Sequence, residues 1–361
     1  MKLQMRLVTM PMITPFETSF GRESHRNALI LNLEHDGISA YSECVTDRDP
    51  HYSYEDNTTA SHIISDYLAS RVKNLPEPSE FIESVADVKG HNMAKAALEM
   101  LLWDYHSRAE KIPLHRALGK SKGYALVGVS IGMDSVENVA KRASDAKNSG
   151  YLRVKIKIKK GREQELVSKV RSAIGDFPLS VDANTDYRIT DLETLKSLDE
   201  YGLVYMEQPL EHTDIVDHAY LAKNIKTPIC LDESILSEED ARKAIDIGAC
   251  KVINIKPGRV GGLTESVRIA KKAREKGCHV WVGGMLETGI GRAFNVAMAS
   301  NDLIDYPGDT SPNSRYFHRD IVRNPFTMEG GKIKPNDNPG TGADVDREEL
   351  EKVTVWKKDL T

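Results

Sequence analysis

The sequence contains little that is typical of a secreted, membrane-bound or nucleic-acid-binding protein. Its four cysteines are scattered and form no CxxC pair, which argues against a disulfide framework or a cysteine-ligated metal. The formal net charge is only -5, and no basic block indicates a nucleic-acid partner. No apolar run reaches the length of a membrane span, and the N-terminus lacks the apolar core of a signal peptide. We therefore expect a cytoplasmic protein with reduced thiols and no membrane or nucleic-acid partner.

From residue 124 onward, short apolar runs alternate with amphipathic helical segments, most of which close on glycine. The runs are ALVGVSIGM, LRVKIKI, PLSVDAN, LVYMEQP, PICLDES, KVINIKP and HVWVGGM. An eighth unit is poorly marked near Leu303–Tyr306. This alternation predicts parallel βαβ units. Their number favours a (β/α)8 barrel over an open doubly wound sheet, for which a Gly-rich dinucleotide turn is expected near the start.

The two ends of the chain lack this alternation. NALILNLEHDG and ISAYSEC, separated by a turn signal, predict a hairpin, and HNMAKAALEMLLWDYHSRAEK predicts a long helix. We expect an α/β protein with three parts. These are an α+β capping domain over residues 1–122, a modified (β/α)8 barrel of the TIM type over 123–315, and a segment over 316–361 that packs back on the capping domain and completes it.

Five charged residues stand at or near the ends of successive apolar runs: Lys157, Asp182, Glu207, Asp232 and Lys256. They are 25, 25, 25 and 24 residues apart. In a parallel barrel these strand ends form one mouth, where active sites lie. Three carboxylates from neighbouring strands repel one another unless a cation joins them, and carboxylate oxygens suit Mg²⁺ or Mn²⁺. Structural salt bridges are the alternative, but the regular repeat favours a metal site.

The stretch RVKIKIKK, residues 153–160, has one apolar face and one face of lysines. An edge strand protected by lysine is the simplest explanation of such a pattern. In the barrel interpretation, Lys155 and Lys157 instead point toward the metal, while Lys159 lies beyond the strand in solvent. Neighbouring cations lower a lysine's pKa. Lys157 and Lys256 then become candidate bases on opposite faces of the α-carbon of a bound carboxylate.

At these positions the chain resembles the muconate-lactonizing subgroup of the enolase superfamily, over nearly its whole length. The KxK motif corresponds to Lys155-Ile156-Lys157, and DANxxY corresponds to Asp182-Ala183-Asn184 with Tyr187. Glu207 in MEQP, Asp232 in LDES and Lys256 match the remaining motif positions. The resemblance implies that Mg²⁺ (Mn²⁺ substituting) is held by the three acids and that two lysines are catalytic. It also implies a small-molecule carboxylate substrate, and we expect a homo-oligomer.

Two further stretches are similar to the o-succinylbenzoate synthase/N-acylamino acid racemase branch: KPGRVGG (Lys256–Gly262) and GGMLETGIGRA (Gly283–Ala293). DTSPNSRYFHRDI is also similar, although the branch more usually has Ser-Ala-Ser-Asp where this chain has Ser-Pro-Asn-Ser. FETSFG (Phe16–Gly21) looks like a mobile specificity loop. The branch implies a set of substrate contacts, namely Ser130, Lys155, Asn184, Arg259, Gly284 and Met285. Glu233 is expected to support Asp232 without binding metal. For the stretch Gly283–Ala293, a phosphate site or a tight turn is the alternative interpretation.

The implied reaction is Mg-dependent removal of the proton α to a carboxylate through an enediolate. It leads either to o-succinylbenzoate by dehydration or to racemisation of an N-acylamino acid, and Arg259 favours some racemase capacity. Muconate cycloisomerase and dipeptide epimerase remain alternatives, although the Asp-x-Asp pair typical of the epimerases is missing. A Schiff-base aldolase would leave the three carboxylates unused. A non-catalytic ligand-binding barrel would not need two bases.

Overall fold

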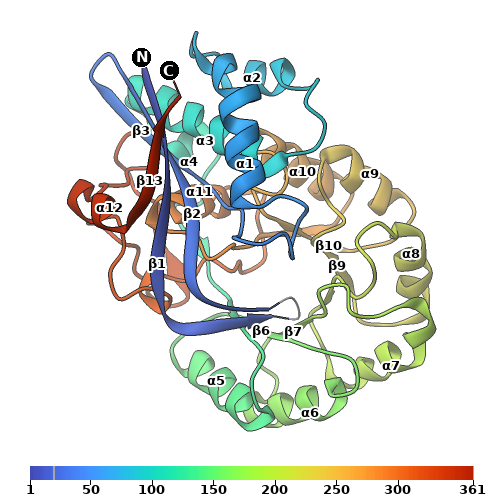
Figure 1. Cartoon of the computed structure of the whole chain (residues 1–361). Coiled ribbons are helices and arrows are strands. Elements are labelled where there is room, and N and C mark those ends of the chain that lie inside the picture. The colour runs from blue at the N-terminus through green and yellow to red at the C-terminus, as the bar shows by residue number, and fades with distance from the viewer. Residues whose placement is uncertain (19–20, 361) are drawn as a thin grey trace.

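The N-terminal part of the chain forms an antiparallel sheet packed against helices (Figure 1). The computed structural model describes residues 1–18 and 21–360, apart from the side chains of residues 18, 21 and 22. The sheet has the strand order β13-β1-β2-β3. The bounds are Lys2–Thr18 for β1, Gly21–His35 for β2, Ile38–Cys44 for β3 and Thr354–Asp359 for β13. The capping domain is thus built from both ends of the chain.

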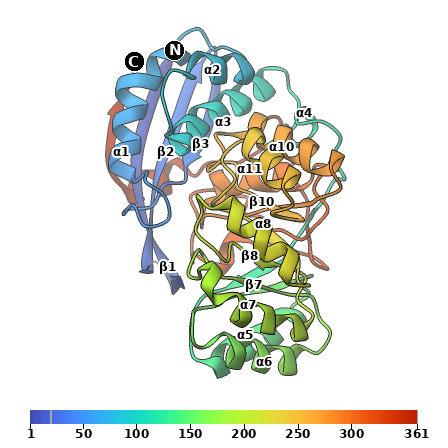
Figure 2. The ribbon, with the colours of Figure 1, turned by 90° about the vertical axis from the view of Figure 1, so that its right-hand side faces the viewer.

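The predicted hairpin is formed by β2 and β3. Its last pair is His35 with Ile38, and the two turn residues Asp36 and Gly37 both have positive φ, 48° and 76°. An Asp-Gly turn of this kind matches the twist of the flanking strands. β1 and β2 form a longer arm that reaches down toward β6 and β7 (Figures 1 and 2). Ser19 and Phe20 of the predicted specificity loop lie outside the described residues.

Four helices complete the N-terminal part: α1 (Asn57–Ile63), α2 (Pro78–Ser84), α3 (Asn92–Ala109) and α4 (Leu114–Ala117). The long α3 corresponds to the predicted helix and packs on β3. At its start, Glu55 accepts hydrogen bonds from the backbone N–H groups of Met93 and Ala94. This carboxylate satisfies donors that have no partner within the helix.

The C-terminal segment returns to the capping sheet, as predicted. Gln4 of β1 is paired with Asp359 of β13, so the two chain ends lie side by side (Figure 1). Helix α12 (Arg347–Val353) directly precedes this strand and contacts β1.

Seven parallel strands form the barrel sheet in the order β11-β10-β9-β8-β7-β6-β5. They are β5 (Val129–Ile131), β6 (Val154–Lys157), β7 (Leu179–Asp182), β8 (Met206–Glu207), β9 (Ile229–Leu231), β10 (Val252–Ile255) and β11 (His279–Val282). β4 (Ala125–Leu126) precedes them and pairs with β12 (Lys332–Ile333). The helices are α5 (Val136–Asn148), α6 (Glu163–Ile174), α7 (Leu192–Ser197), α8 (Ile215–Asn224), α9 (Glu238–Asp246), α10 (Leu263–Glu275) and α11 (Gly289–Ala299). None of the described helices is long and apolar enough to cross a membrane.

The eighth position of the barrel is not a regular strand. The segment after Leu303 instead bridges the two ends of the sheet, because Asp309 N donates to Val282 O at 2.9 Å and Gly128 N donates to Gly308 O at 2.8 Å. A Cβ on Gly308 would lie 2.5 Å from Val282 O. The barrel therefore closes through irregular chain that needs glycine, which explains the weak signal of the eighth unit.

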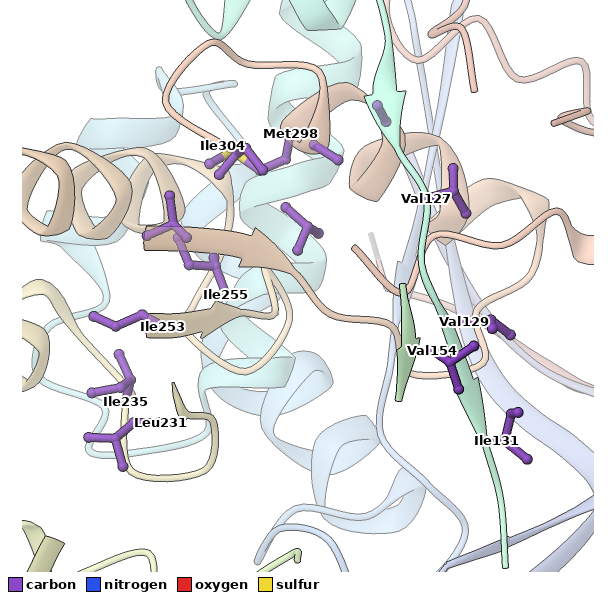
Figure 3. Packing of buried hydrophobic residues seen from close by; sticks show 14 of the residues in the cluster. Val127, Val129, Ile131, Val154, Leu231, Ile235, Ile253, Ile255, Met298 and Ile304 are labelled. Atoms are coloured by element: carbon purple, nitrogen blue, oxygen red, sulfur yellow. The ribbon is translucent and has the colours of Figure 1, made fainter. Parts of the chain in front are cut away.

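The barrel strands send alternate side chains to opposite faces. Val154, Ile253 and Ile255 are buried in the cluster of apolar side chains shown in Figure 3. The intervening residues of the same strands, such as Lys155 and Asn254, are also buried but polar, and they bond Glu207 at the mouth. The same alternation therefore builds the apolar core and supplies the barrel with charged groups.

Candidate active site

The five charged residues of the regular repeat meet at one rim of the barrel. Lys157, Asp182 and Glu207 are the last residues of β6, β7 and β8. Asp232 and Lys256 each come one residue after β9 and β10. Lys157 is paired in register with Asp182, and Asp182 is paired with Glu207.

Buried ion pairs connect these groups. Lys155 Nζ lies 2.7 Å from Glu207 Oε2 and 3.2 Å from Asp182 Oδ2. Lys157 Nζ lies 2.7 Å from Asp182 Oδ2. On the other side, Lys256 Nζ lies 2.9 Å from Asp232 Oδ2, and Arg259 pairs with Asp232 Oδ1. Three carboxylates thus stand side by side at the mouth, with Lys157 on one side and Lys256 on the other.

The donor set suits a hard divalent cation, although cations of the chain itself pair with all three acids. In the described part of the chain, no three acidic, histidine or cysteine side chains are arranged to hold a metal ion. Asp182, Glu207 and Asp232 nevertheless offer only oxygen atoms from three neighbouring strands, which is the chemistry that Mg²⁺ prefers. Asp232 Oδ2 is buried, and its partner is the ammonium group of Lys256. These residues fit Mg²⁺ by donor type and by strand position.

The acids of the site differ in pKa. Burial would raise the pKa of Asp182, but the ammonium groups of Lys157 and Lys155 hold it below its ordinary value. Burial and the neighbouring Asp182 raise the pKa of Glu207, more than Lys155 lowers it. Burial and Asp182 likewise raise the pKa of Glu233. Negative charge is therefore concentrated here, and a bound cation would relieve the repulsion.

The expected lowering of lysine pKa is not observed for two of the lysines. Burial would lower the pKa of Lys256, yet Tyr52, Glu233 and Glu207 raise it overall. Carboxylates outweigh burial in the same way at Lys155. The expectation applies to lysines beside a bound metal cation. Among the protein groups alone, Glu233 and Glu207 at Lys256, and Asp309, Glu207 and Asp182 at Lys155, favour the ammonium form.

Asn184 and Glu233 support the lysine at the other side. Asn184 Oδ1 accepts from Lys157 Nζ at 2.5 Å, and its Nδ2 donates to Glu233 Oε1 at 2.9 Å. Asn184 has φ 42°, a left-handed conformation that asparagine tolerates well. The side chain predicted to contact a ligand thus orients Lys157.

A small cavity of about 70 Å³ lies at the centre of the mouth. Ser130, Lys155 and Gly284 line it, as expected for substrate contacts, and the buried Ser130 hydroxyl has no hydrogen-bond partner among the described residues. Met285 is placed differently, since it packs with the apolar core of the capping domain. Its neighbour Leu286 lines the cavity instead, at φ 57°.

A second cavity of about 450 Å³ lies between the capping domain and the barrel. Tyr52, Glu233 and Arg259 line it. Tyr52 connects this cavity with the smaller one, because its hydroxyl accepts at 3.0 Å from Nζ of Lys256, which lines the smaller cavity. The same hydroxyl donates to Asp232 Oδ1 at 3.2 Å. Small-molecule sites usually occupy about 300–1,000 Å³. Of the two cavities at the site, the second has a volume in this range and the first does not.

Sequence reasoning missed three residues of the site. Asn254 donates to Glu207 Oε1 at 2.8 Å, and its position two residues before Lys256 on one strand could have revealed it. Asp309 lies 2.9 Å from Lys155 Nζ, and the resemblance of its segment to the branch points to no role for this side chain. Tyr52 belongs to an irregular loop of the capping domain, and no sequence pattern points to it.

Comparison with known proteins agrees with this geometry. Residues 2–119 match the family "Mandelate racemase / muconate lactonizing enzyme, N-terminal domain", and residues 138–350 match "Enolase C-terminal domain-like". An o-succinylbenzoate synthase of Geobacillus stearothermophilus is 42% identical, covering 98% of this chain and 96% of the relative. An N-succinylamino acid racemase of Amycolatopsis is also 42% identical, covering 98% and 97%.

A crystal structure of an enolase-superfamily member from Listeria innocua has the same fold as this chain. It superposes with a TM-score of 0.95 at 37% identity, covering 100% of this chain and 99% of that one. A D-Ala-D/L-Ala epimerase of Cytophaga hutchinsonii is more distant, at 27% identity. The chain therefore belongs to the enolase superfamily, in the branch of the o-succinylbenzoate synthases and N-succinylamino acid racemases.

Proposed function

We propose that this protein removes the proton α to the carboxylate of a small molecule, as an o-succinylbenzoate synthase, an N-succinylamino acid racemase or both. The observation that carries the proposal is the arrangement of Lys157 and Lys256 on the two sides of three acidic strand ends. Two bases around one carboxylate site can reach both faces of an α-carbon. The names of the relatives support the choice of reaction.

Asp182, Glu207 and Asp232 would hold Mg²⁺, with Mn²⁺ as a substitute. When bound, the ion would supply stabilisation for negative charge that develops on the substrate carboxylate. Lys155 would add a fixed positive charge beside it, because three carboxylates surround its ammonium group. We propose these roles from donor chemistry and position.

The lysines would have different duties in the two reactions. In racemisation, Lys157 and Lys256 exchange the roles of base and acid according to the enantiomer. In the synthase reaction, Lys157 removes the α-proton and then protonates the departing hydroxide, while Lys256 remains a cation. The raised pKa of Lys256 supports the second duty. Arg259 pairs with Asp232, and it remains our reason to expect racemase capacity as well.

The two cavities suggest how a substrate would lie. The 70 Å³ cavity holds Lys155 and Lys157 and suits the reacting carboxylate. The rest of the molecule, including an acyl chain, would extend past Tyr52 into the 450 Å³ cavity. A Cβ on Gly284 would lie 2.7 Å from Asp309 O, so glycine at this position lets the cavity wall pack closely against the segment that carries Asp309.

We test the two-lysine assignment with Lys256→Arg and Lys157→Ala. Arginine keeps the positive charge but does not act as a base near neutral pH. We expect Lys256→Arg to lose racemisation of N-succinyl amino acids by roughly 10²–10⁴-fold, the usual worth of a general acid–base group. Synthase activity should fall less, and Lys157→Ala should abolish both. Unchanged racemisation in Lys256→Arg would contradict the assignment.

The metal is tested by chelation. EDTA should abolish activity, and Mg²⁺ or Mn²⁺ should restore it, while Glu207→Gln should weaken metal binding without unfolding the protein. Full activity after chelation, or trapping of substrate on a lysine by borohydride, would favour a Schiff-base aldolase instead. We also propose a cytoplasmic location, which four buried free cysteines support.

A further inference from the structure

Two buried glutamates of the capping domain end at the first turns of two barrel helices. Glu99 of α3 reaches α10, where its carboxylate accepts from Leu263 N at 2.9 Å and from Thr264 N at 2.8 Å. The Thr264 hydroxyl donates a third bond at 2.6 Å. The first backbone N–H groups of a helix have no partner within it, so these bonds anchor α10 to the capping domain.

Glu43 makes the same arrangement at α11. Its carboxylate accepts from Thr288 N at 3.0 Å, from the Thr288 hydroxyl at 2.7 Å and from Gly291 N at 3.2 Å. Glu43 belongs to β3, so a strand and a helix of the capping domain each hold one barrel helix. Both glutamates are completely buried.

The close approach depends on glycine at both helices. A Cβ on Gly262 would lie 2.2 Å from Glu99 Oε2, and a Cβ on Gly291 would lie 2.7 Å from Glu43 Oε2. No other residue type leaves this space without displacement. The chain is therefore adapted to these two contacts on both sides of the domain boundary.

Both anchored helices follow loops that shape the surroundings of Lys256. The loop Lys256–Gly262 directly precedes α10 and carries the lysine itself. The loop before α11 passes beside the lysine, since a Cβ on Gly283 would lie 2.8 Å from Lys256 Cγ. It also supplies Gly284 and Leu286 to the small cavity.

The surroundings of Lys157 are held differently. Lys157 bonds Asp182 and Asn184, which are barrel residues. In the loop that leads from it to α6, Lys160 N donates to Asp186 Oδ2 at 2.9 Å, again within the barrel. The two lysines of the site thus depend on the capping domain to different degrees.

We propose that Glu43 and Glu99 are positioning residues that hold the Lys256 side of the active site in place from the capping domain. This inference rests on the proposed function, in which the two lysines serve opposite faces of the substrate. Loosening either anchor should impair proton transfer at the Lys256 face and leave transfer at the Lys157 face nearly unchanged. A misplacement near 1 Å is enough to reduce a rate about 10²-fold.

The experiment uses Glu99→Gln and Glu43→Gln in the full chain with Mg²⁺. Each enantiomer of an N-succinyl amino acid is incubated in D₂O, and α-proton exchange is followed by NMR. Lys157→Ala and Lys256→Ala identify which enantiomer each lysine deprotonates. We expect exchange at the Lys256 face to fall at least about tenfold in both glutamine variants, with a change of less than about threefold at the Lys157 face.

Asp104→Asn is the matched control. Asp104 is a fully buried carboxylate of the same helix α3, but it accepts from Tyr41 N and Thr341 N and anchors no barrel helix. Its variant should affect both faces equally. If a glutamine variant does not fold, Thr264→Ala and Thr288→Ala remove one bond from each anchor and should give a smaller loss at the same face.

Two results would overturn the inference. Equal losses at both faces would indicate general destabilisation, and no loss at either face would show that the anchors do not position Lys256. Absence of exchange with either enantiomer in the unmodified enzyme would refute the racemase part of the proposed function, and the inference with it. These outcomes are distinguishable because the unmodified enzyme is measured in the same assay.

Discussion

The ammonium group of Lys155 lies in a pocket of three carboxylates above an aromatic ring. Its Nζ is 2.7 Å from Glu207, 2.9 Å from Asp309 and 3.2 Å from Asp182, and it lies 4.7 Å from the centre of the Trp281 ring. With its pKa raised by these acids, Lys155 is suited to supply charge and unsuited to serve as a base. Lys157 on the same strand differs, since among the described residues it is paired with one carboxylate, that of Asp182.

Asp309 provides the first prediction at this scale. Besides Lys155, it pairs with Arg153, whose guanidinium is 1% exposed, at 2.5 Å. Asp309→Asn would leave a buried cation without its partner, and breaking such a pair costs about 3–5 kcal/mol of unfolding free energy. Urea unfolding measures this loss. Asp302→Asn is the control, because its exposed pair with Lys120 is worth at most about 1 kcal/mol. Equal losses in the two variants would contradict the prediction.

Single residues could be predicted only where they follow the strand period. The repeat of strand ends places Asp182, Glu207 and Lys256 correctly, because each lies on or next to a short parallel strand. Tyr52 could not be found in this way, since its contact with Lys256 joins residues that are 204 positions apart. Met285 was misplaced because a loop at φ 57° turns its neighbour, Leu286, toward the cavity.

At the scale of elements, the first turn of α10 shows how a helix start is tied to another domain. Gly261 and Gly262 precede this helix with φ of 94° and 128°. Open space surrounds the position of a Cβ on Gly261, whereas on Gly262 it would meet Glu99. Both glycines thus have a positive φ that a side chain disfavours, and they differ in the domain contact.

Gly261→Ala and Gly262→Ala separate the two effects. We expect Gly261→Ala to lose about 1–2 kcal/mol of unfolding free energy, the cost of left-handed backbone with a side chain. Gly262→Ala should lose at least about 1 kcal/mol more, because the new methyl group displaces α10 from Glu99. Denaturant unfolding of both variants gives the difference. An equal loss would mean that the Glu99 contact can move at little cost.

Most elements could be predicted because their signals are local. The alternation of apolar runs with helical segments that close on glycine predicted βαβ units, and α5 and α10 are helices of this kind between barrel strands. The eighth barrel position could not be predicted in this way, because its segment has no regular alternation. Two hydrogen bonds hold it instead, one donated to Val282 O and one donated by Gly128 N. The position of this segment is set by contacts with residues distant in sequence, which a local pattern does not reveal.

At the scale of the whole molecule, one apolar cluster crosses the boundary between the capping domain and the barrel. Ile30 and Met100 of the capping domain belong to the same buried cluster as Val129 and Ile255 of the barrel. The two anchoring glutamates add polar contacts to this apolar boundary. A polar group buried there must be satisfied by hydrogen bonds, and an ionised one costs more than a neutral one.

The last prediction concerns the pH dependence of stability. Burial raises the pKa of Glu99 to about 7, although Thr264, Leu263 and Trp103 donate hydrogen bonds that oppose the shift. In the unfolded chain the same group has its ordinary value of 4.5. Between these two values the folded protein binds more protons than the unfolded one. The contribution of Glu99 to the unfolding free energy is therefore complete below pH 4.5 and is lost as the pH rises to about 7.

Glu99→Gln removes this titration. We expect the unfolding free energy of the unmodified protein, relative to Glu99→Gln, to fall between pH 5 and pH 8 by on the order of 3 kcal/mol, the linkage value for such a shift. Urea unfolding at several pH values measures the difference. Glu137→Gln, which changes an exposed carboxylate in the first turn of α5, controls for the loss of one negative charge and should show a much smaller trend. A difference between Glu99→Gln and the unmodified protein that stays constant with pH would mean that Glu99 is ionised throughout. In that case the three hydrogen bonds from the start of α10 would be strong enough to keep a fully buried charge at the domain boundary.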